Sequence, residues 1–205
     1  MSEKVQDPQR RLLLKLTSAV GAVGAGFAAV PFVASMSPSA RAKAAGAPVE
    51  VDISRLEPGR FAVEEWRGKP IWILRRTPEM LKALEEVKPQ LVDPESKVAS
   101  QQPKYAQNPT RSINPEFLVV IGLCTHLGCS PKRADAGANP NFGLGQDWKG
   151  GFFCPCHGSK FDLAGRVYKD VPAPTNLEVP RHSFVGNNRI VIGIDPDDKN
   201  KKGAA

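Results

Sequence analysis

The apolar residues of the chain form one long segment near the N-terminus and several short segments after residue 48. Between residues 12 and 36 the only charged residue is Lys15. Because an α-helix rises about 1.5 Å per residue, a segment of about 25 residues exceeds the roughly 30 Å hydrocarbon core of a bilayer. The pattern therefore predicts a single N-terminal transmembrane helix.

The short segments that follow have the length and pattern of β-strands. Residues 49–53, 60–66 and 70–75 alternate apolar and polar positions or are rich in β-forming residues. Residues 67–69 (Arg-Gly-Lys) are suited to turn the second of these segments into the third. We therefore expect antiparallel strands in this region.

One segment shows helical spacing. Residues 78–87 carry apolar side chains at helical spacing, namely Met80, Leu81, Leu84 and Val87. Thr77 precedes them as a suitable N-cap, with proline at the first helical position. The sequence predicts one short helix here.

Two apolar segments lead into the cysteines. Residues 117–123 are continuously apolar and of strand length, and residues 151–153 precede the second cysteine group. A hairpin is expected at residues 185–194, where one of the asparagines in Gly186-Asn187-Asn188 can take a positive φ.

Three segments carry no clear pattern. Residues 88–115 contain five prolines and many polar residues, which predicts an irregular surface excursion of unassigned role. Residues 134–150 are rich in Gly and Asn and predict a loop, and the C-terminal residues 196–205 predict a polar tail.

Composition limits the possible classes of protein. A chain of 205 residues holds one globular domain with additional segments, and 19 prolines with 18 glycines indicate many loops and little helix. The net charge is +7, but the basic residues are scattered and form no face interleaved with aromatic residues. We therefore expect a mainly β head and no binding to nucleic acid.

The N-terminus carries a targeting signal. Residues 9–15 (QRRLLLK) resemble a twin-arginine export signal, and Arg10, Arg11 and Lys15 at the start of the apolar segment place the N-terminus in the cytoplasm. The head is then expected in the periplasm, anchored to the bacterial inner membrane by one span. Residues 37–48 predict a flexible tether or a passive linker. An alternative is cleavage of the signal at residues 40–42 (Ala-Arg-Ala).

The candidate chemistry lies in two short boxes. The first box is CTHLGC, residues 124–129, and the second box is CPCHGS, residues 154–159. Each box offers two thiols and one imidazole. A zinc site normally needs four ligands at C-x2-C or C-x2-H spacing, which the boxes fit poorly. Six candidate ligands also leave two over, and leftover cysteines in an exported protein are expected to form a disulfide.

Both boxes resemble those of the Rieske family at nearly every position. The resemblance implies an antiparallel β-sandwich head with a cluster-binding subdomain that holds a [2Fe-2S] cluster. It implies that Cys124 and Cys154 bind one iron and that His126 and His157 bind the other. Neutral imidazoles make the cluster less negative than four thiolates would, so its potential rises to about −150 to +300 mV against about −400 mV for plant-type clusters.

The same resemblance implies roles for the remaining cysteines. Cys129 and Cys156 would form a disulfide between the two boxes, a feature of the high-potential branch of the family. His182 lies outside both boxes, and we interpret it as structural.

Four further residues are expected to tune or shield the cluster. Ser159 resembles the family serine that donates a hydrogen bond to a cluster sulfur, whereas Phe161 stands where many respiratory members have a donating tyrosine. Leu127 resembles the leucine that shields the cluster between its histidines. Pro172 belongs to residues 170–174 (DVPAP), which resemble a covering proline loop, although Val171 replaces a glycine and would be strained at a positive φ.

Taken together, the resemblance implies the Rieske iron-sulfur subunit of a bacterial cytochrome bc1 complex, a proton-translocating quinol:cytochrome c oxidoreductase. The cluster would accept an electron from quinol, with a hydrogen bond and a proton at His157, and pass the electron to cytochrome c1. Expected partners are cytochrome b and cytochrome c1 in a dimeric complex. Two alternatives remain open: the small Rieske subunit of an arsenite oxidase and a zinc-stabilised structural module.

The expected domain boundaries follow from these patterns. Residues 1–36 form the signal and anchor, and residues 37–48 form the tether. Residues 49–195 form the head, with the cluster-binding subdomain at about 122–175, and residues 196–205 form the tail.

Overall fold

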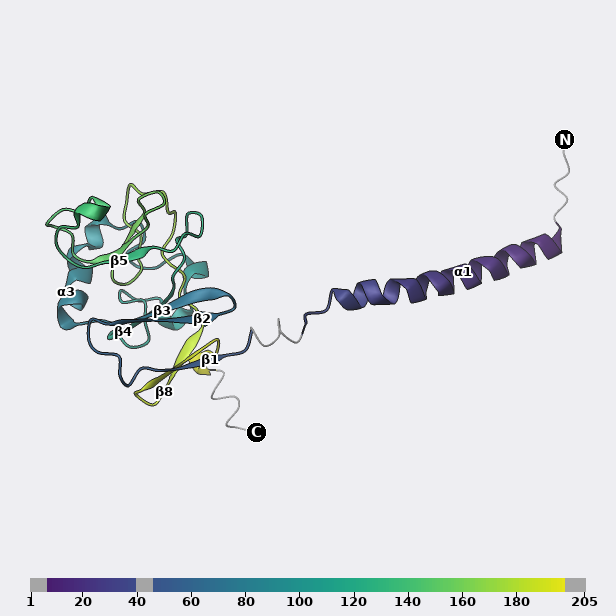
Figure 1. Cartoon of the computed structure of the whole chain (residues 1–205), viewed down its shortest axis with the longest axis horizontal. Coiled ribbons are helices and arrows are strands. Elements are labelled where there is room, and N and C mark those ends of the chain that lie inside the picture. Colours follow the sequence, from purple (N-terminus) through teal and green to yellow (C-terminus); the bar gives the residue numbers. More distant parts are fainter. Residues whose placement is uncertain (1–6, 40–45, 198–205) are drawn as a thin grey trace. The chain divides into compact units, whose positions relative to one another are not determined.

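The computed structural model describes residues 7–39 and 46–197 of the chain. These residues belong to two compact units, Met1–Ala44 and Ala45–Ala205, which Figure 1 draws as a long helix and a strand-rich head. The alternative cleavage site at residues 40–42 lies outside the described residues, as do parts of the expected tether and tail. The finer domain boundaries stay a prediction.

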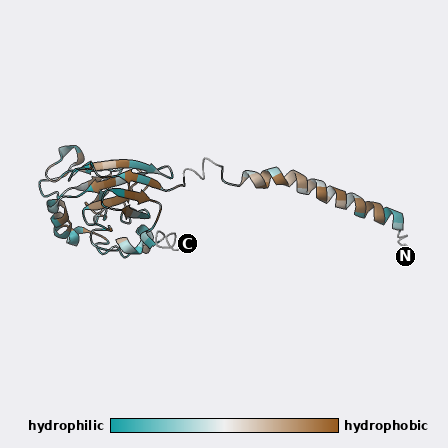
Figure 2. Ribbon diagram, turned by 90° about the horizontal axis from the view of Figure 1, so that it is seen from below, coloured by the Kyte–Doolittle hydropathy of each residue, from teal (hydrophilic) through white to brown (hydrophobic). Residues whose placement is uncertain are grey.

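The first unit contains the helix α1 (Pro8–Ser35). Asp7 caps its N-terminus, because the carboxylate accepts the N–H groups of Gln9 (2.9 Å) and Arg10 (3.4 Å). Apolar residues cover most of its length (Figure 2), and α1 is long and apolar enough to cross a membrane, a test that a signal sequence also passes. The predicted apolar helix is confirmed and begins earlier than the apolar segment itself.

The described part of the head contains nine strands in three antiparallel sheets. The pairing orders are β1-β9-β8, β2-β3-β4 and β5-β6-β7. The strands are β1 (Val49–Asp52), β2 (Phe61–Trp66), β3 (Lys69–Arg75), β4 (Phe117–Ile121), β5 (Lys132–Ala134), β6 (Gly151–Phe153), β7 (Lys160–Phe161), β8 (His182–Val185) and β9 (Arg189–Ile192). The mainly β fold is therefore confirmed, while the short β5 and β7 were not predicted.

The sheet β2-β3-β4 lies in the middle of the head and is covered on both faces (Figure 1). On one face Ile73 and Val119 pack with Ile190 of the sheet β1-β9-β8. On the other face Trp72 packs with Phe152 of β6, and their ring centroids are 5.0 Å apart. Two covered faces explain why β3 and β4 are apolar at consecutive positions. Each fully buried large side chain contributes about 1.5–3 kcal/mol.

The predicted short helix is confirmed as α3 (Pro78–Glu86). Thr77 caps it by accepting the N–H of Met80 (3.3 Å), and Pro78 occupies the first turn, where a missing N–H costs nothing. Leu84 is its fully buried side chain and joins the core beneath β3 and β4.

Two hairpin turns show where positive φ values are needed. Between β2 and β3, Arg67 (φ 54°) and Gly68 (φ 70°) form the two-residue loop, which matches the type I′ turn that suits twisted hairpins. Between β8 and β9 the positive φ falls on Gly186 (φ 62°). The predicted hairpin is confirmed, but neither asparagine takes the positive φ, because glycine adopts this conformation without a Cβ clash.

Residues 88–115, which we call the strap, are irregular and lie at the surface as predicted, and many of them are exposed, but several side chains reach into the interior. The strap contains three short 3-10 turns, η1 (Lys88–Gln90), η2 (Ala99–Gln101) and η3 (Lys104–Ala106); a fourth, η4 (Pro140–Phe142), lies in the loop after β5. Several strap side chains are buried, namely Leu91, Ser96, Gln102, Ala106, Arg111 and Ser112. Backbone carbonyls satisfy some of these polar side chains, since Gln102 Nε2 donates to Ser96 O (2.8 Å), whereas the Ser96 hydroxyl has no partner among the described residues.

Three buried arginines join the strap to the segment after the second box. Arg166 pairs with the buried Asp162 (2.7 Å) and donates to Pro94 O of the strap (3.2 Å). Arg76, which precedes α3, donates both to Thr110 O of the strap (2.9 Å) and to Leu163 O (3.2 Å). Arg111 of the strap donates to Ala164 O (3.2 Å). Burial lowers the pKa of Arg76 to about 9 and of Arg111 to about 10, so both stay charged at neutral pH. Loss of one partner of a buried pair such as Asp162 and Arg166 typically costs about 3–5 kcal/mol.

His182 is fully buried, which agrees with a structural role. Its Nδ1–H donates to Pro180 O (2.8 Å), its backbone N–H donates to the hydroxyl of Tyr105 (2.9 Å), and no described residue offers a partner to Nε2. Burial lowers the pKa of His182, although the Pro180 carbonyl and the charge of Asp195 oppose this shift. The neutral imidazole is therefore the form that the fold stabilises.

We expect His182 to make the stability of the head depend on pH. Below the unfolded-state pKa of about 6.5, the unfolded chain binds a proton that the native imidazole resists, so stability falls as pH decreases, by at most about 1.4 kcal/mol per pH unit from this group. Chemical unfolding of the wild type and of His182→Gln between pH 5 and 7.5 checks this. The variant should lack this component, and parallel stability curves would contradict the prediction.

Candidate metal centre

The two boxes fold into the same backbone ring, although their ligand residues are spaced differently. The first box follows β4 and the second box follows β6. In each box the N–H of the first cysteine donates to the carbonyl of the sixth residue, at 2.7 Å in the first box and 2.8 Å in the second. In each box the N–H of the fifth residue, a glycine, donates back to the carbonyl of the first cysteine (2.9 Å). Gly128 (φ 79°) and Gly158 (φ 77°) take the positive φ that closes these rings.

The first cysteine of each ring is a free, buried thiol. Cys124 is 3% exposed and Cys154 is 2% exposed. Burial raises the pKa of the Cys154 thiol, and a hydrogen bond with the Cys124 side chain raises it further. Two thiols in contact inside an apolar core resist becoming anions together, so they favour a bound cation that stabilises both thiolates.

The two imidazoles of the boxes lie next to each other at the surface. The ring centroids of His126 and His157 are 4.9 Å apart and the ring planes are nearly perpendicular, at 87°. His126 is half-buried, whereas His157 is exposed. The exposed His157 can therefore contact a molecule in solution, while His126 stays partly covered by the protein.

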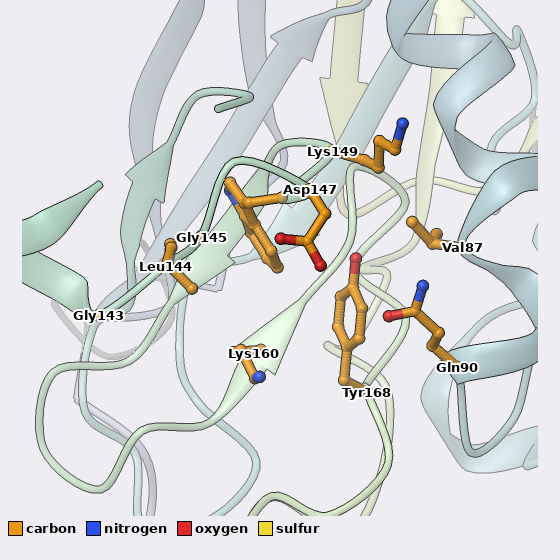
Figure 3. Close-up of a pocket in the computed structure, with 10 residues that line it drawn as sticks. Val87, Gln90, Gly143, Leu144, Gly145, Asp147, Lys149, Lys160 and Tyr168 are labelled. Carbon is orange, nitrogen blue, oxygen red and sulfur yellow. The ribbon is translucent and has the colours of Figure 1, made fainter. Parts of the chain in front are cut away.

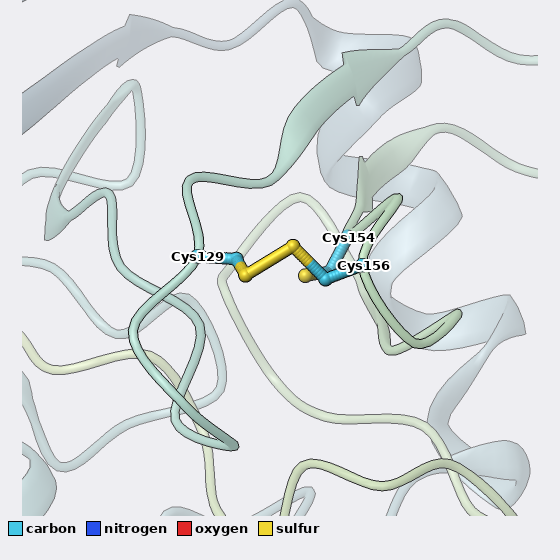
Figure 4. A group of neighbouring side chains, drawn as sticks. All are labelled: Cys129, Cys154 and Cys156. Atoms are coloured by element: carbon cyan, nitrogen blue, oxygen red, sulfur yellow. A yellow bond between two sulfur atoms is a disulfide. The ribbon is translucent and has the colours of Figure 1, made fainter.

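The remaining two cysteines form a disulfide that joins the boxes. Cys129 is bonded to Cys156, with Cα atoms 6.7 Å apart, and so the predicted disulfide is present. Figure 4 shows the sulfur of Cys154 beside this disulfide, and the three sulfurs lie within 4.8 Å of one another. Disulfide sulfurs carry no thiolate, so these three cysteines do not form a metal site. The disulfide instead fixes the distance between the boxes.

The donors that remain suit a two-iron cluster. They are two adjacent thiols and two adjacent imidazoles, and a Rieske cluster takes two cysteines on one iron and two histidines on the other. The residues present therefore fit the [2Fe-2S] group that the sequence led us to expect.

A third loop, residues 170–176, contacts both boxes, and we call it the proline loop. The N–H of Ala173 donates to the hydroxyl of Ser159 in the second box (3.0 Å). The hydroxyl of Thr125 in the first box donates to Thr175 O (2.7 Å). These two bonds hold the proline loop against the boxes.

The backbone of the proline loop differs from the expectation at one residue. The positive φ falls on Asp170 (φ 58°) and not on Val171. Aspartate tolerates this conformation better than a β-branched residue, so the strain expected at Val171 does not arise. Pro172 is exposed, while Ala173 beside it is buried.

The expected tuning and shielding residues lie in contrasting environments. Leu127 is 71% exposed, which is unusual for a large apolar side chain. Ser159 and Phe161 are fully buried, and Phe161 packs in the apolar core that also contains Cys124 and Cys154. Sequence reasoning missed Thr125, because a threonine inside a ligand box carries no spacing signal of its own.

Cavities of the head help to delimit the site. One groove is lined by Cys124, Thr125 and Thr175 together with Lys69 and Glu178, and therefore runs beside the first box. A separate cavity lies between Gln90, Asp147 and Tyr168 (Figure 3). Its lining includes none of the candidate ligands, so this second cavity is not part of the metal site.

Two family models match the sequence. The model described as "Rieske [2Fe-2S] domain" matches residues 49–181. The model described as "Ubiquitinol-cytochrome C reductase Fe-S subunit TAT signal" matches residues 1–39. The match to the first model covers more than half of the chain.

Curated relatives match over nearly the whole chain. The ubiquinol-cytochrome c reductase iron-sulfur subunit of Allochromatium vinosum is 61% identical over 197 residues, which cover 95% of this chain and 92% of that protein. Proteins with the same name from Blastochloris viridis and Bradyrhizobium diazoefficiens are 42% and 41% identical. These matches cover 94% and 91% of this chain, and 96% and 95% of the relatives.

We expect Gly122, at the entrance to the first box, to tolerate no side chain. A Cβ at Gly122 would overlap the indole of the buried Trp72, which packs on Phe152 and cannot move aside. Gly122→Ala should therefore lower the free energy of unfolding of the head by about 1–3 kcal/mol or more. Chemical unfolding of the full chain measures this loss.

Gly145→Ala is the matched control, because the added Cβ would meet only the carboxylate of the exposed Asp147 (2.8 Å), which can rotate away. Equal losses of stability in the two variants would show that the Trp72 contact does not matter.

Proposed function

Because this chain belongs to the Rieske [2Fe-2S] family, as an iron-sulfur subunit of the ubiquinol-cytochrome c reductase type, we propose that it accepts electrons from quinol and delivers them to cytochrome c1. The single observation that carries this proposal is the pairing of two buried thiols with two adjacent imidazoles on two loops that share the same pair of backbone hydrogen bonds.

We propose Cys124 and Cys154 as ligands of one iron and His126 and His157 as ligands of the other. When bound, the [2Fe-2S] cluster supplies a one-electron acceptor of raised potential. The exposure of His157 supports its role as the residue that accepts a hydrogen bond from quinol. The ring nitrogen of His157 that does not bind iron can accept the proton that leaves quinol together with the electron.

The surrounding residues exclude water and supply hydrogen bonds. Leu127 is proposed to shield the cluster on the exposed side, and Pro172 to cover it from the proline loop. Ser159 is proposed as a donor to a cluster sulfur, because its hydroxyl already accepts from Ala173 and keeps its own hydrogen for a second partner. Phe161 offers no donor.

The proposed partners are cytochrome b and cytochrome c1 in a dimeric complex. Membrane anchoring is supported by the apolar α1 and by the match to a twin-arginine signal. The positively charged start of α1 supports a cytoplasmic N-terminus and a periplasmic head. The arsenite oxidase and zinc alternatives lose support, since the relatives that match over nearly the whole chain are ubiquinol-cytochrome c reductase subunits.

The proposed function predicts a cluster whose midpoint potential is high and falls as pH rises. Electron gain and proton gain are linked at a histidine ligand, and a coupled one-electron, one-proton step changes by about 59 mV per pH unit. EPR-monitored redox titration of membranes across pH measures this slope. Purification of the complex should also recover haem b and haem c, whereas molybdopterin or the absence of a reduced-state signal would contradict the proposal.

Phe161→Tyr should raise the midpoint potential. A hydroxyl at this position would add a hydrogen bond toward a cysteine ligand and stabilise the reduced cluster by about 0.5–1.5 kcal/mol, which corresponds to roughly 20–60 mV for one electron. Protein-film voltammetry of both forms provides the measurement.

Phe152→Tyr serves as the control, because Phe152 pairs with Phe161 across β6 and β7 but its ring packs on Trp72. It should lower stability and leave the potential unchanged. An unchanged potential in Phe161→Tyr would remove this explanation.

A further inference from the structure

The strap holds the proline loop at both of its ends. Before the loop, the N–H of Lys169 donates to Gln90 O (2.8 Å), and Figure 3 shows the side chain of Gln90 beside Tyr168. After the loop, the N–H of Val179 donates to Gln101 O (2.8 Å). The strap thus fixes the backbone on both sides of the proline loop.

One side chain of the proline loop is also bonded to the strap. Asn176 is 1% exposed and uses both ends of its carboxamide. Its Oδ1 accepts the N–H of Val167 (2.9 Å), and its Nδ2 donates to Asp93 O in the strap (3.0 Å). A buried amide with two partners is fixed in position, because loss of either bond leaves a buried polar group unsatisfied.

Residues close to Asn176 in the proline loop are hydrogen-bonded to both boxes. Its neighbour Thr175 accepts the hydroxyl hydrogen of Thr125 (2.7 Å). Ala173, three residues before Asn176, donates its N–H to Ser159 (3.0 Å). A hydroxyl has a single hydrogen to donate, so the bond from Ala173 limits the directions in which the Ser159 hydrogen can point.

We propose that Asn176 is a positioning residue for the metal centre, through which the strap sets the orientation of the Ser159 hydroxyl and hence the redox potential. The inference rests on the proposed function, since it assumes a cluster that receives the hydrogen bond from Ser159. It gives the strap a role in electron transfer in addition to its role in the fold.

The test is redox titration and EPR of Asn176→Ala in the full chain, assembled in membranes. Release of the proline loop should weaken the Ser159 donor. The equilibrium constant for reduction should fall about threefold or more, where tenfold corresponds to about 59 mV for one electron. The g values of the reduced state should shift as well. Asn176→Ser keeps a polar group at the buried site and should show the same changes if the alanine variant does not fold.

Two further measurements decide between positioning and general loss of stability. Ile190 packs on β3 and β4 in the core on the other face of the middle sheet, away from the boxes. Ile190→Val should therefore lower stability and leave the potential and the g values unchanged. Hydrogen exchange at the Ala173 amide should increase in the Asn176 variants and not in Ile190→Val. Faster exchange with an unchanged potential, or equal potential shifts in the control, would overturn the inference.

The same experiment separates this inference from the proposed function. A wild-type protein without a reduced-state EPR signal would refute the function. Hydrogen exchange at Ala173 would then decide the positioning role alone, and unchanged exchange in the Asn176 variants would overturn it.

Discussion

The contact between the thiols of Cys124 and Cys154 is the constraint on which the rest of the head depends. Both are buried in the core that contains Trp72 and Phe152, and burial raises the pKa of the Cys154 thiol. A metal that binds both thiols needs their loops at one separation, and loops that are already held there lose less conformational entropy when the metal binds. The head meets this requirement with backbone rings inside each box, a disulfide between the boxes and the proline loop across them.

These devices are supported from further away by the middle sheet and the strap. The sheet β2-β3-β4 carries the first box at the end of β4, and its Trp72 packs on Phe152 just before the second box. The strap contacts the segment that leads from the second box into the proline loop, with buried arginines donating to that segment's carbonyls. The middle sheet and the strap, which are far apart in the sequence, thus both support the two boxes and the proline loop.

Sequence patterns predicted the elements whose signals are local. The helix α3 was found from its cap at Thr77 and its apolar spacing, and β6 from the apolar residues before Cys154. The boxes were found because their residue types and spacing are specific. The strands β5 and β7 were missed because strands of three and two residues show no periodicity, and only pairing with β6 defines them.

The burial of individual polar side chains in the strap could not be predicted from its composition. Polar and proline-rich sequences usually lie at the surface, but here Arg111 and Gln102 find carbonyl partners that only the folded chain supplies. The same reason explains the proline loop, where the residue with positive φ is Asp170 and not Val171. The bonds of Asn176 to Val167 and Asp93 likewise exist only once the strap is in place.

The disulfide has a consequence for the order in which the protein matures. In a reducing compartment Cys129 and Cys156 would be thiols, so iron delivered there would meet four sulfurs instead of two. Selection would then depend on burial and ring position, because Cys124 and Cys154 begin their rings inside the core, whereas Cys156 is exposed. Later oxidation of Cys129 and Cys156 to the disulfide would remove them as competing ligands, so the iron would stay on Cys124 and Cys154.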